Sequence, residues 1–142
     1  LNAIIEEVLV PYRQSEGRIA YRCELQDDLP ILDLDPEQIK RALMNLLNNA
    51  TTAVRDGGEI EVRSCYDPVL KMVTLEISDN GCGIPKEDME RIFEPYFSTK
   101  KSGMGLGLAI VNTIISDHNG YIRVKAREPK GTTFTIELPV KR

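Results

Sequence analysis

Apolar residues recur every three or four positions in three stretches, which is the spacing of helices that cover a core. The first runs from Asn2 to about Ser15 and contains Pro11, which can kink or shorten it. The second follows Asp35-Pro36-Glu37-Gln38, where an N-cap aspartate and a proline at the first helical position favour a helix start. The third runs from Leu108 to about Asp117 and ends at Asn119-Gly120. The pattern therefore predicts three main helices.

About five other segments are typical of strands and are bounded by glycine, proline and aspartate. They span residues 19–25, 59–66, 72–78, 121–126 and 132–138. The pattern also predicts a short extended piece over Ile31–Leu34, a short helix over Lys86–Ile92, and a long irregular stretch from Phe93 to Gly107. Helices and strands in these proportions predict a two-layer α/β sandwich.

Length and charge narrow the class of protein. The chain has 142 residues, enough for one domain with a real core. Its 22 acidic and 18 basic side chains give a net charge of −4, so no basic face for nucleic acid stands out. No apolar run approaches the roughly 20 residues that a membrane helix needs. The chain opens on Leu1 rather than methionine, so we expect a piece of a longer protein.

Cysteine and histidine usage favours a reduced, cytosolic compartment without zinc. Cys23, Cys65 and Cys82 are widely spaced, form no CxxC pair, and are accompanied by the single histidine His118. An odd number of scattered thiols is typical of proteins that stay reduced.

Three asparagines fall within five positions of the second helix, although asparagine is a poor to middling helix former. Asn45 and Asn49 are four residues apart and share a helix face, whereas Asn48 lies on a neighbouring face. Amide oxygens are neutral ligands that suit Mg²⁺ when phosphates supply most of the charge. The segment is either part of a metal–phosphate site or an ordinary polar helix face.

A second cluster, Asp79-Asn80-Gly81-Cys82-Gly83-Ile84-Pro85, directly follows a predicted strand. A carboxylate beside glycines can approach a flat ligand and accept a hydrogen bond from an exocyclic amine such as that of adenine. Taken alone, the cluster is explained more simply as a glycine-rich turn.

Two more signals lie in the irregular stretch. Gly103-Met104-Gly105-Leu106-Gly107 opens the third helix, where backbone N–H groups can meet phosphate oxygens, or serves as a hinge. It is no dinucleotide fingerprint, because Leu108 replaces the third glycine, and no P-loop. Phe93-Glu94-Pro95-Tyr96-Phe97-Ser98-Thr99-Lys100 is typical either of a lid, with Lys100 and Lys101 within reach of phosphate, or of a loop pinned by its aromatic residues.

The order of these motifs resembles the catalytic and ATP-binding domain of sensor histidine kinases, in the superfamily shared with gyrase, Hsp90 and MutL. The motifs are Asn-x-x-x-Asn-Ala, Asp-x-Gly-x-Gly-Ile-Pro, Phe-Glu-Pro-Tyr-Phe, Gly-x-Gly-Leu-Gly-Leu and Gly-Thr-Thr-Phe. The resemblance runs from Leu1 to Pro139 and is strongest toward the nitrogen-regulation (NtrB/NtrY-type) branch. It implies a Bergerat-type α+β two-layer sandwich, with a mixed five-stranded sheet and three helices on one face.

The resemblance also implies a role for each matching residue. Asn49 would coordinate Mg²⁺ between the ATP phosphates, and Asn45 would help to hold metal or phosphate; these two are the expected catalytic residues. Asp79 would accept a hydrogen bond from the adenine amino group. The remaining expected ATP-binding residues are Gly81, Gly83, Ile84, Phe97, Lys100, Gly103, Gly105, Leu106, Gly107, Leu108 and, through water, Thr133.

Two departures bear on the chemistry. Thr52 stands where some kinases of the family have a basic residue aimed at phosphate, so that contribution is absent or comes from Lys100 or Lys101. Asn45 stands where hydrolytic relatives have a glutamate base, and an amide cannot take a proton at neutral pH. The sequence therefore predicts a domain that holds ATP without hydrolysing it. A hydrolytic ATPase clamp and a non-catalytic nucleotide- or protein-binding module remain the alternatives.

His118 is expected to cap the third helix rather than accept phosphate. The resemblance places the acceptor histidine on an upstream dimerisation domain. The expected partners are therefore that phosphoacceptor domain, in a homodimeric parent on the cytoplasmic side, and indirectly a response regulator. We expect residues 1–142 alone to bind Mg-ATP without phosphorylating themselves, and to contact neither nucleic acid nor membrane.

Overall fold

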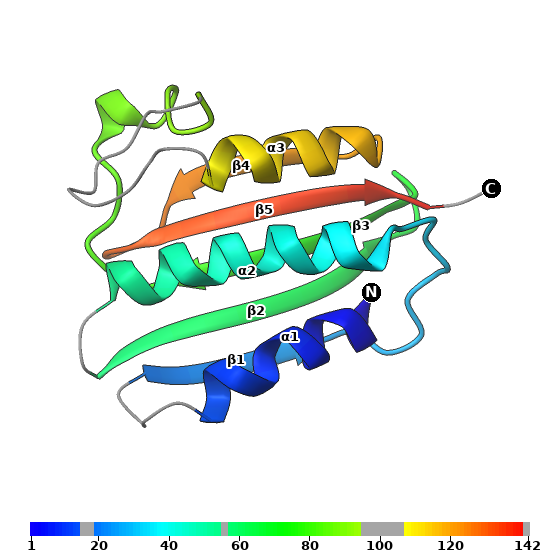
Figure 1. Cartoon of the computed structure of the whole chain (residues 1–142), viewed down its shortest axis with the longest axis horizontal. Coiled ribbons are helices and arrows are strands. Elements are labelled where there is room, and N and C mark those ends of the chain that lie inside the picture. Colours follow the sequence, from blue (N-terminus) through cyan, green and yellow to red (C-terminus); the bar gives the residue numbers. More distant parts are fainter. Residues whose placement is uncertain (15–18, 55–56, 95–106, 141–142) are drawn as a thin grey trace.

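Helices and strands follow one another in the order that the hydrophobic pattern predicts. The computed structural model describes residues 1–14, 19–54, 57–94 and 107–140. The elements, labelled in Figure 1, are α1 (Asn2–Gln14), β1 (Ile19–Leu25), α2 (Pro36–Ala53), β2 (Gly58–Asp67), β3 (Met72–Asp79), the 3₁₀ turn η1 (Lys86–Asp88), α3 (Gly107–Asp117), β4 (Tyr121–Ala126) and β5 (Thr132–Pro139).

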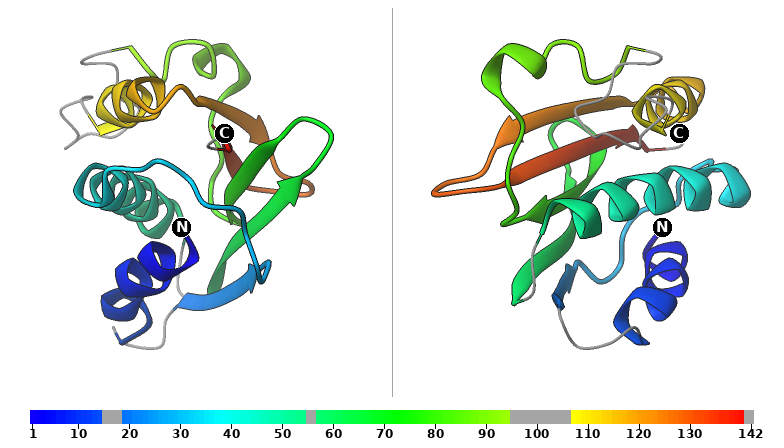
Figure 2. Two further views of the ribbon diagram at one scale, coloured as in Figure 1. Left: turned by 90° about the vertical axis from the view of Figure 1, so that its right-hand side faces the viewer. Right: turned by 60° about the vertical axis from the view of Figure 1, so that its left-hand side comes forward.

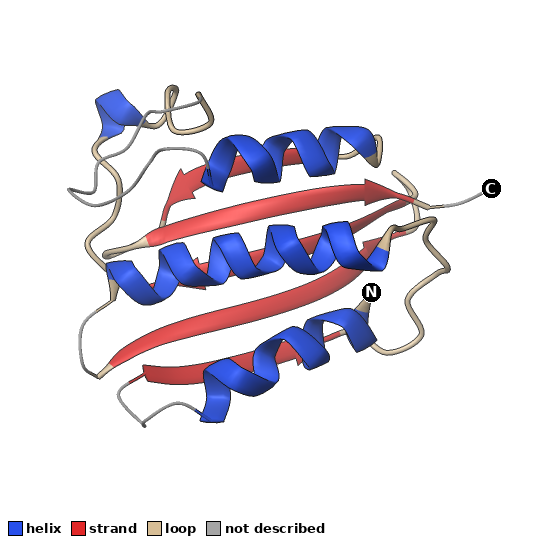
Figure 3. Cartoon of the chain, viewed as in Figure 1, coloured by secondary structure: helices blue, strands red, loops and turns tan. Residues whose placement is uncertain are grey.

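The five strands form one mixed sheet in the order β1-β2-β3-β5-β4. β1 and β2 are parallel, because α2 connects them as a crossover, and the other three pairings are antiparallel. All three α-helices lie on the same face of the sheet (Figure 3). The predicted fold, a two-layer α+β sandwich with a mixed five-stranded sheet, is confirmed.

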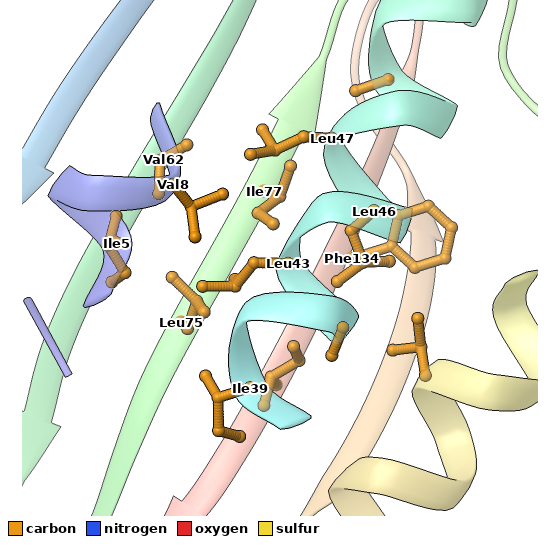
Figure 4. Packing of buried hydrophobic residues seen from close by; sticks show 14 of the residues in the cluster. Ile5, Val8, Ile39, Leu43, Leu46, Leu47, Val62, Leu75, Ile77 and Phe134 are labelled. Atoms are coloured by element: carbon orange, nitrogen blue, oxygen red, sulfur yellow. The ribbon is translucent and has the colours of Figure 1, made fainter. Parts of the chain in front are cut away.

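The core lies between the helix layer and the sheet (Figure 2). Along β3, Val73, Leu75 and Ile77 alternate with half-buried polar residues, so every second side chain points at the helices. The buried face of α2 supplies Ile39, Leu43, Leu46 and Leu47. Figure 4 shows these side chains interleaved with the sheet and with Ile5 and Val8 of α1. Each such burial contributes roughly 1.5–3 kcal/mol to stability.

The opposite face of the sheet is polar. Arg22 of β1 pairs with Glu59 of β2 at 3.0 Å, and Arg63 of β2 pairs with Glu24 of β1 at 3.4 Å. Within the residues that the structure describes, no helix has both the length and the apolar character needed to cross a membrane.

Three local predictions need correction or completion. The helix predicted over Lys86–Ile92 is wrong: only Lys86–Asp88 form a 3₁₀ turn, and i→i+3 hydrogen bonds continue as turns to Glu94. Contacts with distant residues set the path of this segment instead, because Ile92 is buried and the Phe93 ring packs edge-on against Phe134. The short extended piece predicted over 31–34 belongs to no strand of the sheet, and α1 continues past Pro11 to Gln14.

Candidate functional site

Four element ends meet at one end of the molecule. Helix α2 and strand β3 end there, and β5 and α3 begin there, at the left of Figure 1. These ends contribute the second half of α2 with its asparagines, Asp79, Gly131 with the first residues of β5, and Gly107. Motifs that lie far apart in the sequence are therefore brought to one place.

Asp79 is a buried carboxylate at the end of β3. Its side chain lies on the helix face of the sheet, in step with Val73, Leu75 and Ile77, and the residue is only 3% exposed. One carboxylate oxygen, Oδ1, accepts a 2.9 Å hydrogen bond from the backbone N–H of Gly81. A charged group this deep must be hydrogen-bonded. Asp79 therefore has a fixed orientation beneath the helix layer.

Glycines let three backbone segments approach one another around Asp79. A Cβ atom at Gly81 would overlap the carbonyl oxygen of Ala53 at the end of α2. The neighbouring N–H of Cys82 donates to that oxygen at 3.1 Å. A Cβ at Gly131, where φ is +117°, would overlap the carbonyl oxygen of Asp79. The glycine loop is thus clamped between α2 and the turn that opens β5.

The asparagines of α2 divide between two faces as predicted. Asn45 and Asn49 are half-buried, whereas Asn48 is exposed. A Cβ placed on Gly107 would lie 3.6 Å from Oδ1 of Asn45, so the α3 N-terminus approaches the Asn45 amide without a side chain between them. The arrangement puts the Asn45 amide beside the N-terminus of α3, and both features suit a metal–phosphate group.

Thr133 does not lie on the face of Asp79. Its hydroxyl is 2.8 Å from that of Ser78, its cross-strand partner on the polar face of the sheet. Thr132 pairs with Asp79 in the register, shares its face, and is 3% exposed. The motifs do not single out Thr132, but counting alternate residues back from the buried Phe134 places it on the core face.

The other expected site residues fall into two groups. Ile84 and Leu108 are half-buried and pack against the core, and Gly83 adopts φ +78° next to the Gly131 carbonyl. Outside the described residues lie Phe97, Lys100, Lys101, Gly103, Gly105 and Leu106.

The histidine caps α3, as predicted. Its ring Nδ1 lies 2.7 Å from the carbonyl oxygen of Ile114, and its Nε2 accepts a 3.0 Å hydrogen bond from the backbone N–H of Asp35. Because Nε2 is an acceptor, this bonding assigns the proton to Nδ1. Asn119, at φ +62°, and Gly120, whose N–H donates to Ile115, complete the helix end. The contact joins the end of α3 to the start of α2.

The asparagine side chains of α2 carry amide oxygens, which are possible ligands for a cation. Among the described residues, no group of three or more His, Cys, Asp or Glu side chains is arranged to hold a metal ion. Amide oxygens such as those of Asn45 and Asn49 are neutral, so a cation that they hold needs negative charge from a phosphate.

A two-layer α+β domain with a buried carboxylate, a glycine loop and a helix of paired asparagines defines a nucleotide-binding domain. Residues 34–142 match the family described as histidine kinase-, DNA gyrase B- and HSP90-like ATPase, and the chain belongs to this family. Within it, the match to sensor histidine kinases confirms the predicted resemblance and the predicted ATP-binding class.

Two similar curated proteins are histidine kinases of Escherichia coli. The chain is 39% identical to the signal transduction histidine-protein kinase AtoS of Escherichia coli over 99% of its length, which is 23% of AtoS. It is 38% identical to the sensor kinase ZraS of the same organism, again over 99% of the chain and 30% of ZraS. The chain thus spans less than a third of these two relatives.

Solved structures confirm the domain. The catalytic domain of histidine kinase ThkA superposes with a TM-score of 0.86 at 35% identity, covering 98% of this chain and 91% of that one. The mycobacterial sensor histidine kinase MprB gives the same TM-score at 30% identity, with coverage of 97% and 94%.

Proposed function

We propose that this chain binds Mg-ATP between Asp79 and the asparagine face of α2, and presents the γ-phosphate to a histidine on a separate domain of its parent kinase. The observation that supports it most is the buried Asp79 carboxylate, held by Gly81 and clamped by Gly131. Such a carboxylate can accept a hydrogen bond from an exocyclic amine, as adenine offers.

The residues present fit both the adenine base and the Mg²⁺–phosphate group. Asp79 would orient the base, with Thr132 rather than Thr133 beside it on the same sheet face. Asn49 and Asn45 would hold Mg²⁺ and phosphate. Asn45 supports this role because it lies next to Gly107, the first residue of α3, which has no side chain. The ion would neutralise charge on the phosphates during transfer. This chain's own contribution is to position the nucleotide.

Hydrolysis by this domain is not favoured, because Asn45 cannot act as a base. His118 is not the acceptor either, because both of its ring nitrogens are engaged at the far end of α2 and α3. The acceptor histidine would lie on the parent's dimerisation domain, and the parent would be a homodimer. A relative of this chain, ThkA, has been solved in complex with a response regulator, which supports a similar partner for the parent here.

Two finer predictions belong to the same proposal. Assignment to the nitrogen-regulation branch is supported by an NtrB of Rhodobacter capsulatus, 40% identical over 75% of the chain, while AtoS and ZraS match at similar identity. A cytoplasmic location is supported by three free cysteines among the described residues.

Calorimetric titration with ADP, with and without Mg²⁺, tests the site directly. Wild type should bind, and Mg²⁺ should strengthen binding. Asp79→Asn should lose about tenfold to a hundredfold in affinity, because the hydrogen bond lost is one to a charged group. Asp27→Asn, at an exposed turn, is the matched control and should bind like wild type. Equal affinity of Asp79→Asn and wild type would refute the adenine role.

The same protein separates the kinase from its two alternatives. Incubation with γ-labelled ATP should leave residues 1–142 unlabelled and release no steady ADP. Steady ADP production would favour a hydrolytic clamp, and failure of wild type to bind nucleotide would favour a protein-binding module. Label that is lost in His118→Ala would show that His118 accepts phosphate after all.

A further inference from the structure

The third asparagine of α2 has a partner outside the site. Asn48 is exposed and lies off the face shared by Asn45 and Asn49. Its Oδ1 accepts a 2.7 Å hydrogen bond from the Tyr12 hydroxyl, near the end of α1. The same hydroxyl lies 3.4 Å from the Met44 carbonyl oxygen. The back of the asparagine-bearing turn is therefore attached to α1.

Two threonines secure the same turn from its C-terminal side. The hydroxyls of Thr51 and Thr52 donate to the Asn48 carbonyl oxygen at 3.0 and 2.8 Å. Thr52, which stands where some relatives have a basic residue, is thus engaged with the helix backbone. The side chain and the carbonyl group of Asn48 are both engaged, so the orientation of this turn depends on its neighbours.

Helices α1 and α2 are also joined by a second contact, nearer the start of α2. Lys40 of α2 bonds Glu7 of α1 at 2.6 Å, and the buried residues of α1 pack into the shared core. Tyr12 lies closer to the site than this pair, because it reaches the Asn48 level of α2. Its ring also contacts Tyr21 of β1, with 6.4 Å between the ring centroids. Burial, and to a lesser extent Tyr21, raise the pKa of Tyr12, which keeps its hydroxyl a donor.

We propose that Tyr12 is a positioning residue for the metal end of the site: through Asn48 it fixes the turn that presents Asn45 and Asn49, and so couples the placement of α1 to Mg-nucleotide binding. The proposal rests on the proposed function. It gives α1 a role that its sequence, a plain amphipathic helix, does not reveal. Rotation or shift of α1 would reach the asparagine turn first, through Asn48, whereas Asp79 is held by Gly81 and Gly131, and the Gly81 loop contacts α2 at its end, Ala53.

Removing one hydroxyl tests this coupling. Tyr12→Phe should weaken ADP binding in the presence of Mg²⁺ by about threefold to tenfold, as expected for one hydrogen bond. Binding without Mg²⁺, which rests on Asp79, should be unchanged. Tyr21→Phe is the matched control, because the Tyr21 hydroxyl forms no hydrogen bond with the described residues. Asn48→Ala should reproduce the effect, and the double variant Tyr12→Phe/Asn48→Ala should add little to it.

The outcomes separate this proposal from the proposed function. If Tyr12→Phe binds Mg-ADP like Tyr21→Phe, or loses affinity equally with and without Mg²⁺, the positioning role is refuted while the nucleotide site stands. Failure of wild type to bind Mg-ADP refutes both. A second readout needs no nucleotide: the side-chain amide NMR signals of Asn45 and Asn49 should shift in Tyr12→Phe and stay in place in Tyr21→Phe. Unmoved signals in Tyr12→Phe would refute the coupling.

Discussion

At the scale of single residues, Gly131 makes the closest approach of the described glycines to another backbone segment, the end of β3 at Asp79. It adopts φ +117°, and a Cβ there would overlap the carbonyl oxygen of Asp79 and approach Asn80. Gly131→Ala should therefore cost at least about 2 kcal/mol of unfolding free energy, from backbone strain and overpacking together. Urea denaturation followed by circular dichroism measures this loss.

Gly57 provides the control for that substitution. It also has a positive φ, +83°, but none of the described residues lies within 4 Å of its Cβ position. Gly57→Ala should therefore cost only the backbone strain, about 1 kcal/mol. Equal losses for the two variants would show that the close approach to Asp79 contributes nothing.

The candidate site residues were chosen because they form short motifs, and their roles remain predictions. Asn45, Asp79 and Gly107 come from separate motifs; the structure places Gly107 beside Asn45 and puts Asp79 at the end of β3. The motif Gly-Thr-Thr-Phe does not show which of its threonines shares a sheet face with Asp79. That depends on strand register, which pairs Asp79 with Thr132 and Ser78 with Thr133. Asn48 and Tyr12 could not be paired from sequence, because 36 residues separate them and nothing local predicts their contact.

At the scale of elements, α2 and α3 are antiparallel neighbours joined at one end by a side chain. His118 follows α3 and accepts the N–H of Asp35, whose own carboxylate caps α2 by accepting from Glu37 and Gln38. The other end of α3 begins at Gly107 beside Asn45. The histidine thus fixes the register of the two helices from outside the site.

His118→Ala should lower the unfolding free energy by about 1–2 kcal/mol, since it removes a helix cap and an acceptor together. ADP affinity should be unchanged, because the contact lies away from Asp79 and Asn45. Urea denaturation and calorimetry on the same sample check both expectations. Ser116→Ala, exposed on the same helix, is the control. Loss of ADP affinity in a folded His118→Ala protein would contradict this assignment.

Elements were predicted well where the local signal and the packing agree. α2 begins at Pro36, where the Asp35 cap and the proline act together, and β1 spans Ile19–Leu25 as its pattern predicts. The segment after Pro85 was predicted as a helix, but Ile92 and Phe93 fix its path through contacts with distant residues. Local periodicity cannot report such contacts.

At the scale of the whole molecule, the two faces of the sheet are specialised. Among the described residues, the polar side chains buried on the helix face are Ser64, which bonds Asn2 of α1, and Asp79 with Thr132 at the other end of the sheet. The other face has charge pairs such as Arg22 with Glu59. Because polar residues on the helix face are few, Asp79 stands out there as a functional candidate on burial alone.

Stability should fall in alkaline solution. Burial raises the pKa of Tyr12 and Tyr21 above the ordinary value of 10.0, and the hydrogen bond to Glu7 raises that of Lys40. A raised pKa means that the folded state holds the proton more tightly. Below about pH 10 folded and unfolded tyrosines are both protonated and full stability is present; above it the unfolded chain ionises first, and stability is lost.

Urea midpoints measured between pH 8 and pH 11 should therefore be level at first and then decline. Tyr21→Phe is the informative variant, because it removes a titrating group without removing a hydrogen bond to the described residues. Its midpoint should decline less steeply with pH than that of wild type, and Tyr12→Phe/Tyr21→Phe less steeply still, whatever their starting stabilities. Parallel declines in all three proteins would show that the tyrosines at the α1–β1 contact do not govern the alkaline loss.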